Sequence, residues 1–226
     1  MLNISAYLQE FLDRAYLNRP PFLTTNVEKQ TKELKLTRAV SLKYPTDCVF
    51  REGYAENLYV HPTTKIEYPC IIIACDSEKV LDLFCEIIDL IGEKELDIVL
   101  ESSHDIAFGH LDYYAEGVDL TVLKSAIYDF EDLFLRDGNT GIIVYNAREN
   151  REVQLNGTKN ITVYDSDFRK YERVLQSFGI KKENPDMDFL YAIDPDDLIR
   201  HSTPEHFQQF NEFKERFGCE AKLPDL

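Results

Sequence analysis

Two histidines and two aspartates stand close together in the segment from Ser103 to Asp112. Imidazole nitrogens and carboxylate oxygens are groups that zinc and iron accept as ligands in proteins. His104, His110 and Asp112 are therefore the candidate metal ligands of this chain. Their spacing matches no defined ligand motif, and histidines at the surface of an acidic loop, or hydrogen-bonded there, are the simpler interpretation. On the sequence alone we expect no bound metal and no other cofactor.

The other histidines and the cysteines predict no second reactive site. His201 and His206 flank the start of a predicted helix, where the positive end of the dipole does not favour a cation. Cys75 precedes a helix N-terminus, which favours a thiolate, but Asp76 and Glu78 follow it and oppose a second negative charge. We interpret Cys75 as a small buried apolar residue and expect no catalytic residue among these side chains.

Four acidic residues share one face of a helix predicted to begin after a cap at Asp76 or Ser77 and to end at Ile91. At about 100° per residue, their side chains fall within about 80° of one another. They are Glu78, Asp82, Glu86 and Asp89. Like charges at this spacing cost an isolated helix roughly 0.2–0.5 kcal/mol per pair, so either solvent or a basic partner must accommodate them. These four residues are the predicted partner-binding site.

The net charge of the chain also favours a positively charged partner. The formal net charge is −16, and the segment from Asp76 to Gly138 holds 17 acidic and 4 basic residues. Such a surface repels phosphate backbones, so we expect no nucleic-acid binding and instead a positively charged protein surface as partner. The basic segment from Thr24 to Pro45 is interpreted as the solvated face of a strand.

Several classes of protein are disfavoured by what the sequence lacks. There is no glycine-rich phosphate loop, no dinucleotide-binding fingerprint and no nucleophile elbow. No segment approaches the roughly 18 apolar residues of a membrane span, and the N-terminus lacks the basic start of a signal peptide. The 5 cysteines show no Cys-x-x-Cys spacing, which favours reduced thiols. We therefore expect a cytoplasmic protein that does not contact membranes.

Apolar periodicity predicts the elements that must position these residues. Helices are expected at Ile4–Ala15, Ser77–Ile91, Asp119–Asp137, Asp165–Phe178 and Thr203–Gly218. Strands are expected at Glu33–Tyr44, Asn57–His61, Lys65–Cys75, Leu96–Glu101, Gly141–Asn146, Arg151–Leu155, Lys159–Tyr164 and Asp188–Ile193. The dipeptide Asn156-Gly157 indicates a type I′ hairpin turn, and Ser102–Gly117 is expected to be a loop.

This mixture predicts an α+β fold, with a mixed and largely antiparallel sheet flanked by amphipathic helices. No linker or repeat divides the chain. We expect a single unit over residues 1–226, or two tightly packed lobes at 1–101 and 118–226.

The C-terminal half resembles a group of acidic, uncharacterised bacterial proteins. The resemblance rests on Asp137-Gly138 before Thr140-Gly141-Ile142, on Glu152-Val153-Gln154, and on His201-Ser202 before a final aromatic helix. It covers about Asp129 to Gly218 and implies a bacterial origin with no known activity. Where the group carries a His-Lys pair after Glu-Val-Gln, this chain has Thr158-Lys159.

Together these features favour a non-enzymatic, cytosolic protein-binding module, comparable to small immunity or antitoxin proteins or to an adaptor. The alternative is a metal-dependent enzyme that uses the loop from His104 to Asp112. The oligomeric state cannot be read from the sequence.

Overall fold

A computed structural model of the chain describes residues 34–43, 51–61, 63–92, 94–104, 109–183 and 198–221. The helix expected at Ile4–Ala15 and the strand expected at Asp188–Ile193 lie outside the described residues.

The described strands form an eight-stranded sheet in the order β10-β5-β4-β6-β7-β8-β3-β2, in which every neighbouring pair is antiparallel. The strands are β2 (Gly53–Val60), β3 (Glu67–Ala74), β4 (Glu95–Ser102), β5 (Leu111–Asp119), β6 (Thr140–Asn146), β7 (Arg151–Leu155), β8 (Ile161–Tyr164) and β10 (Glu220–Ala221). The predicted α+β fold with a largely antiparallel sheet is confirmed.

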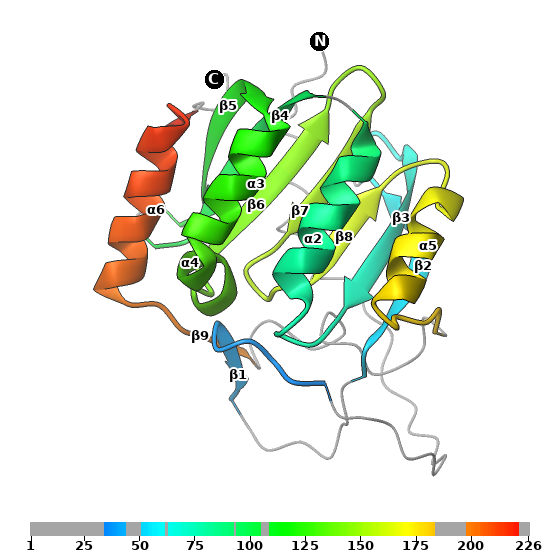
Figure 1. Ribbon diagram of the computed structural model, residues 1–226, viewed down its shortest axis with the longest axis horizontal. Coiled ribbons are helices and arrows are strands. Elements are labelled where there is room, and N and C mark those ends of the chain that lie inside the picture. Colours follow the sequence, from blue (N-terminus) through cyan, green and yellow to red (C-terminus); the bar gives the residue numbers. More distant parts are fainter. Residues whose placement is uncertain are drawn as a thin grey trace.

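The helices lie together on one face of this sheet (Figure 1). They are α2 (Val80–Ile88), extended by the 3-10 turn η1 (Asp89–Ile91), α3 (Leu120–Asp129), α4 (Glu131–Arg136), α5 (Arg169–Ser177) and α6 (Pro204–Arg216). The main apolar core fills the space between helices and sheet, with Phe84 and Ile87 of α2 packed toward Ile98 and Val144 of the sheet. The burial of these side chains provides most of the driving force for this layered arrangement.

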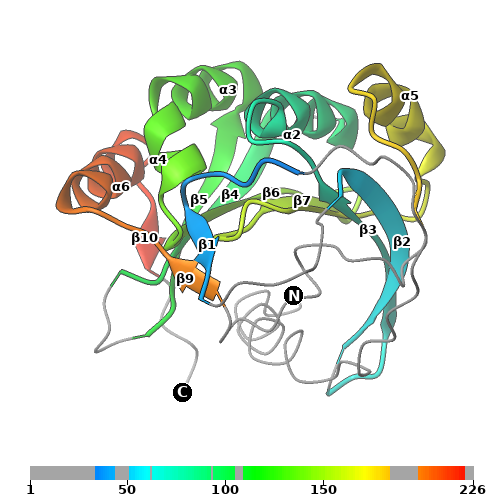
Figure 2. The same cartoon turned by 90° about the horizontal axis from the view of Figure 1, so that it is seen from below.

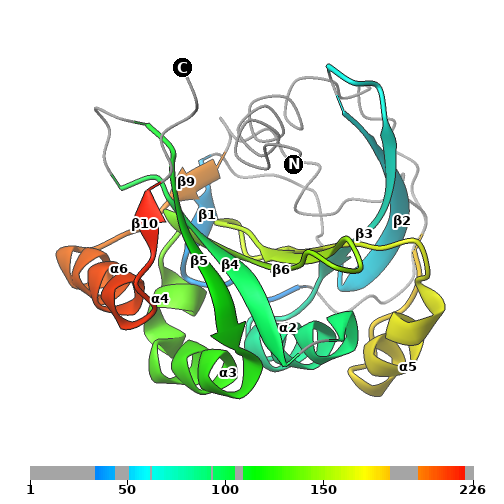
Figure 3. The same ribbon diagram turned by 90° about the horizontal axis from the view of Figure 1, so that it is seen from above.

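The sheet is strongly curved, and β2 and β3 bend away from the helices (Figures 2 and 3). The face opposite the helices is called the inner face here. Alternation along each strand sends every second side chain to the inner face, where Val99 and Ile143 form a small separate apolar cluster. Polar side chains of β4, β5 and β7 share that face.

A second, two-stranded sheet closes one corner of the molecule. β1 (Val40–Leu42) pairs antiparallel with β9 (Leu198–Arg200). The pair is tied to the start of β6, because Gly138 donates its N–H to the His201 carbonyl at 2.7 Å. A Cβ atom at Gly138 would collide with the carbonyl oxygen of Ala39, so this close approach requires glycine.

The long strand expected at Glu33–Tyr44 is wrong for most of its length within residues 34–43, since only Val40–Leu42 is a strand. Residues 34–37 instead follow the loop between β3 and α2, where Lys35 donates its N–H to Asp76 Oδ1 at 2.9 Å. Leu34 is buried there against Ala55 and Ala74. The alternation of apolar residues before Val40 therefore arises from an irregular segment that buries one side, and not from a strand.

The loop expected at Ser102–Gly117 is also wrong, because β5 occupies Leu111–Asp119. A register shift interrupts its pairing with β4, and Gly117 at the shift has a φ of +66°. Such a bulge disrupts the period-two pattern from which a strand is recognised. Because β5 pairs with β4, Asp112 lies directly beside Glu101 of β4.

The predicted positions of the β7–β8 turn and of the helix after β5 are correct, but the turn type and the continuity of the helix are not. Asn156-Gly157 does begin the β7–β8 turn, but the positive φ falls on Lys159 at +63°, so the turn is not type I′. Asn156 Oδ1 accepts N–H groups of Thr158 and Asn160 and so organises a longer connection. The expected helix Asp119–Asp137 is divided at Phe130 into α3 and α4.

Candidate metal centre

Glu101 and Asp112 are direct cross-strand partners on the inner face of the sheet. Glu101 is the second-last residue of β4, and its Cα partner in β5 is Asp112. Both side chains are withdrawn from solvent, with 7% of each side chain exposed. Like charges directly opposite one another on antiparallel strands are destabilising, and burial strengthens the repulsion. The pair therefore needs either a proton or a cation.

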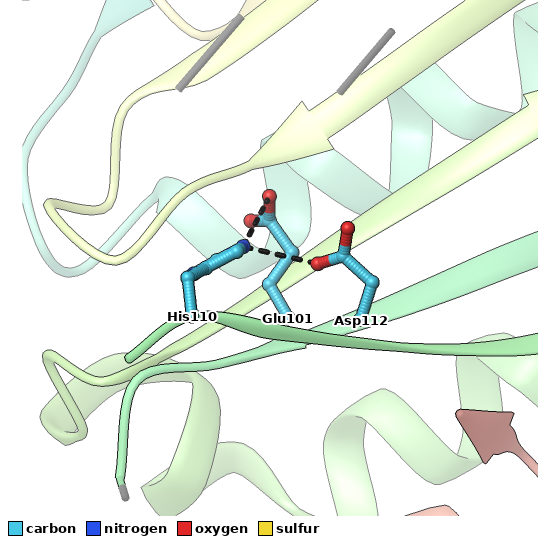
Figure 4. A group of neighbouring side chains, drawn as sticks. All are labelled: Glu101, His110 and Asp112. Atoms are coloured by element: carbon cyan, nitrogen blue, oxygen red, sulfur yellow. Dashed lines mark ion pairs between the residues drawn. The ribbon is translucent and has the colours of Figure 1, made fainter. Parts of the chain in front are cut away.

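An imidazole nitrogen lies beside both carboxylates. His110 immediately precedes β5, and its Nε2 is 3.0 Å from Asp112 Oδ1 and 3.8 Å from Glu101 Oε1. One ligand atom from each of the three residues lies within 4.8 Å of the others. Figure 4 shows the three side chains pointing at one spot.

The atoms that meet there are not satisfied by hydrogen bonds. Within the part of the chain that the structure describes, neither His110 Nε2 nor Asp112 Oδ1 has a hydrogen-bond partner, although both atoms are buried. Their separation of 3.0 Å allows an ion pair with a protonated ring, but not in hydrogen-bonding geometry. Buried polar atoms normally have partners, so a buried carboxylate oxygen without one indicates an additional group at this position.

The other ring nitrogen of His110 is held by a serine. Ser103 Oγ lies 3.1 Å from His110 Nδ1. If Nδ1 carries the proton and donates it to Ser103, then Nε2 presents its lone pair toward Glu101 and Asp112. Metal-binding histidines are commonly oriented in this way by a hydrogen bond from their second nitrogen.

Burial and the neighbouring acids shift the protonation of the group. Burial raises the pKa of Glu101 to about 7, a change that the charges of Asp112 and Glu152 reinforce and that of His110 opposes. Burial lowers the pKa of His110, but the carboxylates of Asp112 and Glu101 outweigh it, so that the net shift is upward. Both shifts favour the protonated forms of Glu101 and His110, with which a metal ion would compete.

A glycine makes room for the Glu101 carboxylate. On its other side, Glu101 pairs with Gly141 of β6. A Cβ atom at Gly141 would collide with Glu101 Oε2. Only glycine allows the carboxylate to lie flat across β6 and remain next to Asp112.

Two further buried titratable groups share this part of the inner face. Glu152 lies on β7 beside Gln154, which donates a side-chain hydrogen bond to it, and burial raises the pKa of Glu152 to about 7. Lys159 is 4% exposed, and its Nζ donates to the Thr140 carbonyl at 2.7 Å. Burial lowers the pKa of Lys159 to about 7, against the opposing charges of Asp137 and Glu101.

Of the three candidate ligands chosen from the sequence, His110 and Asp112 come together and His104 does not. His104 Nε2 lies 2.8 Å from Asp137 Oδ2, and its ring centroid is 5.1 Å from those of Phe207 and Phe210. Burial raises the pKa of Asp137, but hydrogen bonds from His104 and Thr140 outweigh burial and lower it to about 2. His104 therefore belongs to a structural pair.

Glu101 is the ligand that sequence reasoning missed. It was assigned only to the end of a predicted strand, although it stands two residues before the segment with the two histidines. A signal was available in that position, because a strand end next to a candidate ligand loop is where a further ligand is expected. Its pairing with Asp112 required knowledge of β5.

The four acids of the α2 face are exposed, and three of them contact other side chains of the chain. Glu78 forms an ion pair with Lys35 at 2.9 Å. Asp82 accepts a hydrogen bond from Tyr128 Oη at 2.9 Å, and Asp89 forms an ion pair with Lys124 at 2.5 Å. These contacts reduce the charge that the face offers to a partner.

The remaining candidates have structural surroundings. His206 completes a capping box with Thr203 at the start of α6, and its Nε2 lies 3.2 Å from Asp132 Oδ2. Ser41 Oγ lies 2.8 Å from Nε2 of the exposed His201. Burial raises the pKa of Cys75 to about 12, which agrees with its interpretation as an unreactive buried thiol.

The ligand set leaves coordination positions open. One nitrogen and two carboxylates are three protein ligands, and a metal with three protein ligands keeps at least one position for water or substrate. The mixed donor set suits first-row divalent ions such as zinc, manganese and iron. Such an arrangement is typical of catalytic rather than purely structural metal sites.

Comparison with known proteins gives no relative: no family model, no curated protein and no solved structure matches the chain. The resemblance of Asp129–Gly218 to acidic bacterial proteins therefore stays a prediction. None of the helices in the described part of the chain has the length and apolar character needed to cross a membrane.

Proposed function

We propose that this chain binds one divalent first-row metal ion through Glu101, His110 and Asp112 and carries out metal-dependent hydrolysis there. The observation that carries the proposal is the direct pairing of two buried carboxylates beside an imidazole nitrogen that contacts both of them and makes no hydrogen bond. A cation at their meeting point removes the repulsion between Glu101 and Asp112 and binds the nitrogen and the carboxylate oxygens together.

The reaction class follows from the three-ligand set. A metal ion with an open position binds water and lowers its pKa toward neutrality, which produces a hydroxide nucleophile. The same ion polarises an oxygen of the substrate. No covalent nucleophile from the protein is needed for this chemistry, which agrees with the raised pKa of the buried cysteine thiols.

The proposal is tested by titrating chelator-treated protein with Zn²⁺ and with Mn²⁺ in a calorimeter. The wild-type chain should bind one ion, and H110Q and D112N should each lose most of this affinity. E95Q removes an exposed carboxylate from the other end of β4 and should bind like the wild type. Absence of stoichiometric binding, or equal binding by D112N, would overturn the proposal.

A second proposal concerns the acidic face of α2. Asp82 and Glu86 are exposed on α2, with Glu78 exposed in the turn before it and Asp89 in η1 after it, which supports docking of a basic protein surface without any catalysis. Replacing the four residues by their amides should abolish low-salt binding to immobilised polylysine. If the variant binds as the wild type does, this face is only solvated.

We also propose a cytoplasmic location. Its support is the state of the cysteines that the structure describes, since Cys70, Cys75, Cys85 and Cys219 are free and buried. Free thiols persist in a reducing compartment. Labelling of the protein in intact and in lysed cells with a membrane-impermeant reagent tests the location.

A further inference from the structure

Arg200 is an exposed arginine at the end of β9. Among the described residues its side chain makes no hydrogen bond and no ion pair, although its backbone pairs with Val40 of β1. Other arginines of the chain are paired, such as Arg136 with Asp132 and Arg216 with Asp129. In a chain with 41 acidic residues, an unpaired guanidinium held on a strand is available for an external anion.

The backbone places Arg200 next to the candidate metal centre. Its Cα and Cβ lie against Gly138, at 3.1 and 3.0 Å from the position a Cβ would take there. Its Nη1 lies 3.7 Å from the corresponding position on Gly157. Arg200 thus contacts Gly138, and the Glu101 carboxylate contacts Gly141. Arg200 and Glu101 therefore lie against the two ends of the same segment, residues 138–141.

Charge coupling agrees with this placement. The positive charge of Arg200 lowers the pKa values of Glu101, His110 and Lys159, after the larger effect of burial on each. All three residues belong to the metal centre or to its surroundings. The placement itself rests on geometry, because the approach of Arg200 to Gly138 and Gly157 puts the guanidinium at the same corner of the sheet as Glu101, which pairs with Gly141.

A second cation lies on the inner side of the same corner. Lys159 Nζ has one hydrogen bond, to the Thr140 carbonyl, and an ammonium group has three donors. Once a divalent ion balances Glu101 and Asp112, the positive charge of Arg200 remains without a carboxylate of the site to neutralise it. The loaded centre then favours an anion.

We infer that Arg200 binds a phosphoryl group of the substrate, with one oxygen of that group at an open position of the metal. The inference rests on the proposed metal site and names its substrate class. The planar guanidinium matches two oxygens of a phosphoryl group, which lysine cannot do. A phosphoryl group carries more charge than a carboxylate and suits a centre with a divalent ion and a guanidinium beside it.

The test follows inorganic phosphate on Mn²⁺-loaded protein by phosphorus NMR. Manganese bound by the protein accelerates the relaxation of a phosphorus nucleus held beside it, and free manganese is measured in the same samples by electron paramagnetic resonance. R200Q keeps the side-chain atoms that pack on Gly138, so the corner remains folded. R173Q removes an exposed, unpaired arginine from α5 and is the matched control.

We expect phosphate to bind the wild type and R173Q equally and R200Q about 10- to 100-fold more weakly, with R200K in between. Manganese affinity should be unchanged in R200Q. If R200Q binds manganese and phosphate as well as the wild type does, Arg200 does not bind the phosphoryl group, and the proposed metal site is unaffected by this result. Stronger competition by acetate than by added phosphate overturns the phosphoryl assignment. Failure of the wild type to bind manganese overturns the metal site itself.

Discussion

The carboxylates of Glu101 and Asp112 face each other directly across two antiparallel strands, and both are buried. Few arrangements in a sheet are less favourable without a cation between them. His110 adds an imidazole nitrogen, and Gly141 leaves the space that the Glu101 side chain occupies. Four residues from three consecutive strands of the sheet thus define one centre.

The space above Gly141 gives the first prediction. G141A should destabilise the protein by about 1–3 kcal/mol, because the new methyl group displaces the Glu101 carboxylate, and should weaken metal binding. Urea denaturation and calorimetry measure the two effects. In the E101A variant the carboxylate is absent, so adding G141A should lower the free energy of unfolding by much less than it does in the wild type. An equal cost in both backgrounds would show that the methyl group collides with something else.

Orientation of the His110 ring gives the second prediction. S103A removes the partner of His110 Nδ1 and should weaken metal binding about 10-fold. S102A is a matched control, because Ser102 Oγ lies 3.0 Å from Nδ1 of His104, outside the centre. Metal titration of both variants measures the difference. If S102A loses as much affinity as S103A, the ring of His110 is not held by Ser103.

Protonation of Glu101 gives the third prediction. Its pKa is about 7 in the folded protein and 4.5 as the ordinary value, so the folded state holds the proton more tightly. The metal-free protein should therefore lose stability as pH rises from about 4.5 to 7, by an amount on the order of 3 kcal/mol from this group. E101Q should remove this loss and be more stable than the wild type at pH 8.

Denaturation curves of metal-free protein between pH 4 and pH 8 test this directly. Added metal should restore the stability of the wild type at pH 8 and leave that of E101Q unchanged. A wild-type protein whose stability does not depend on pH in this range would contradict the raised pKa of Glu101.

The pair of His104 and Asp137 gives the fourth prediction, which concerns stability alone. D137N should cost about 3 kcal/mol, because Asp137 is fully buried and accepts a hydrogen bond from Thr140 Oγ1 at 2.5 Å. The pKa of Asp137 is lowered to about 2. Its contribution is therefore complete above about pH 4 and is lost as pH falls toward 2.

Urea denaturation at pH 7 and at pH 3 separates this effect from the metal centre. The wild type should lose more stability between these pH values than D137N does, and both should bind metal equally at pH 7. A loss of metal affinity in D137N would place His104 in the centre after all.

The sequence predicted correctly those helices and strands whose signals lie within a few consecutive residues. The apolar stripe of α2 and the Thr203-Pro204 start of α6 are confirmed because helix spacing and capping are encoded within a few residues. Strands β7 and β8 are confirmed because their apolar residues alternate, and β6 because it is a short, continuously apolar and largely β-branched run. The fold class followed from these elements.

The centre itself could be predicted only in part, because it depends on register. His110 and Asp112 stood out by type, but β5 was hidden by the bulge at Gly117 and by the polar residues it turns to the inner face. Glu101 becomes a ligand only when β5 pairs beside it. His104 matches His110 in type, and only the fold separates them, by directing His104 to Asp137.

X-ray absorption on protein loaded with one equivalent of Zn²⁺ tests the central claim most directly. The account predicts a coordination sphere with one imidazole nitrogen at about 2.0–2.1 Å and carboxylate oxygens at about 2.0–2.2 Å. The imidazole signal should vanish in H110Q and persist in H201Q. A spectrum without imidazole in the wild type, or one that H110Q leaves unchanged, would contradict the account.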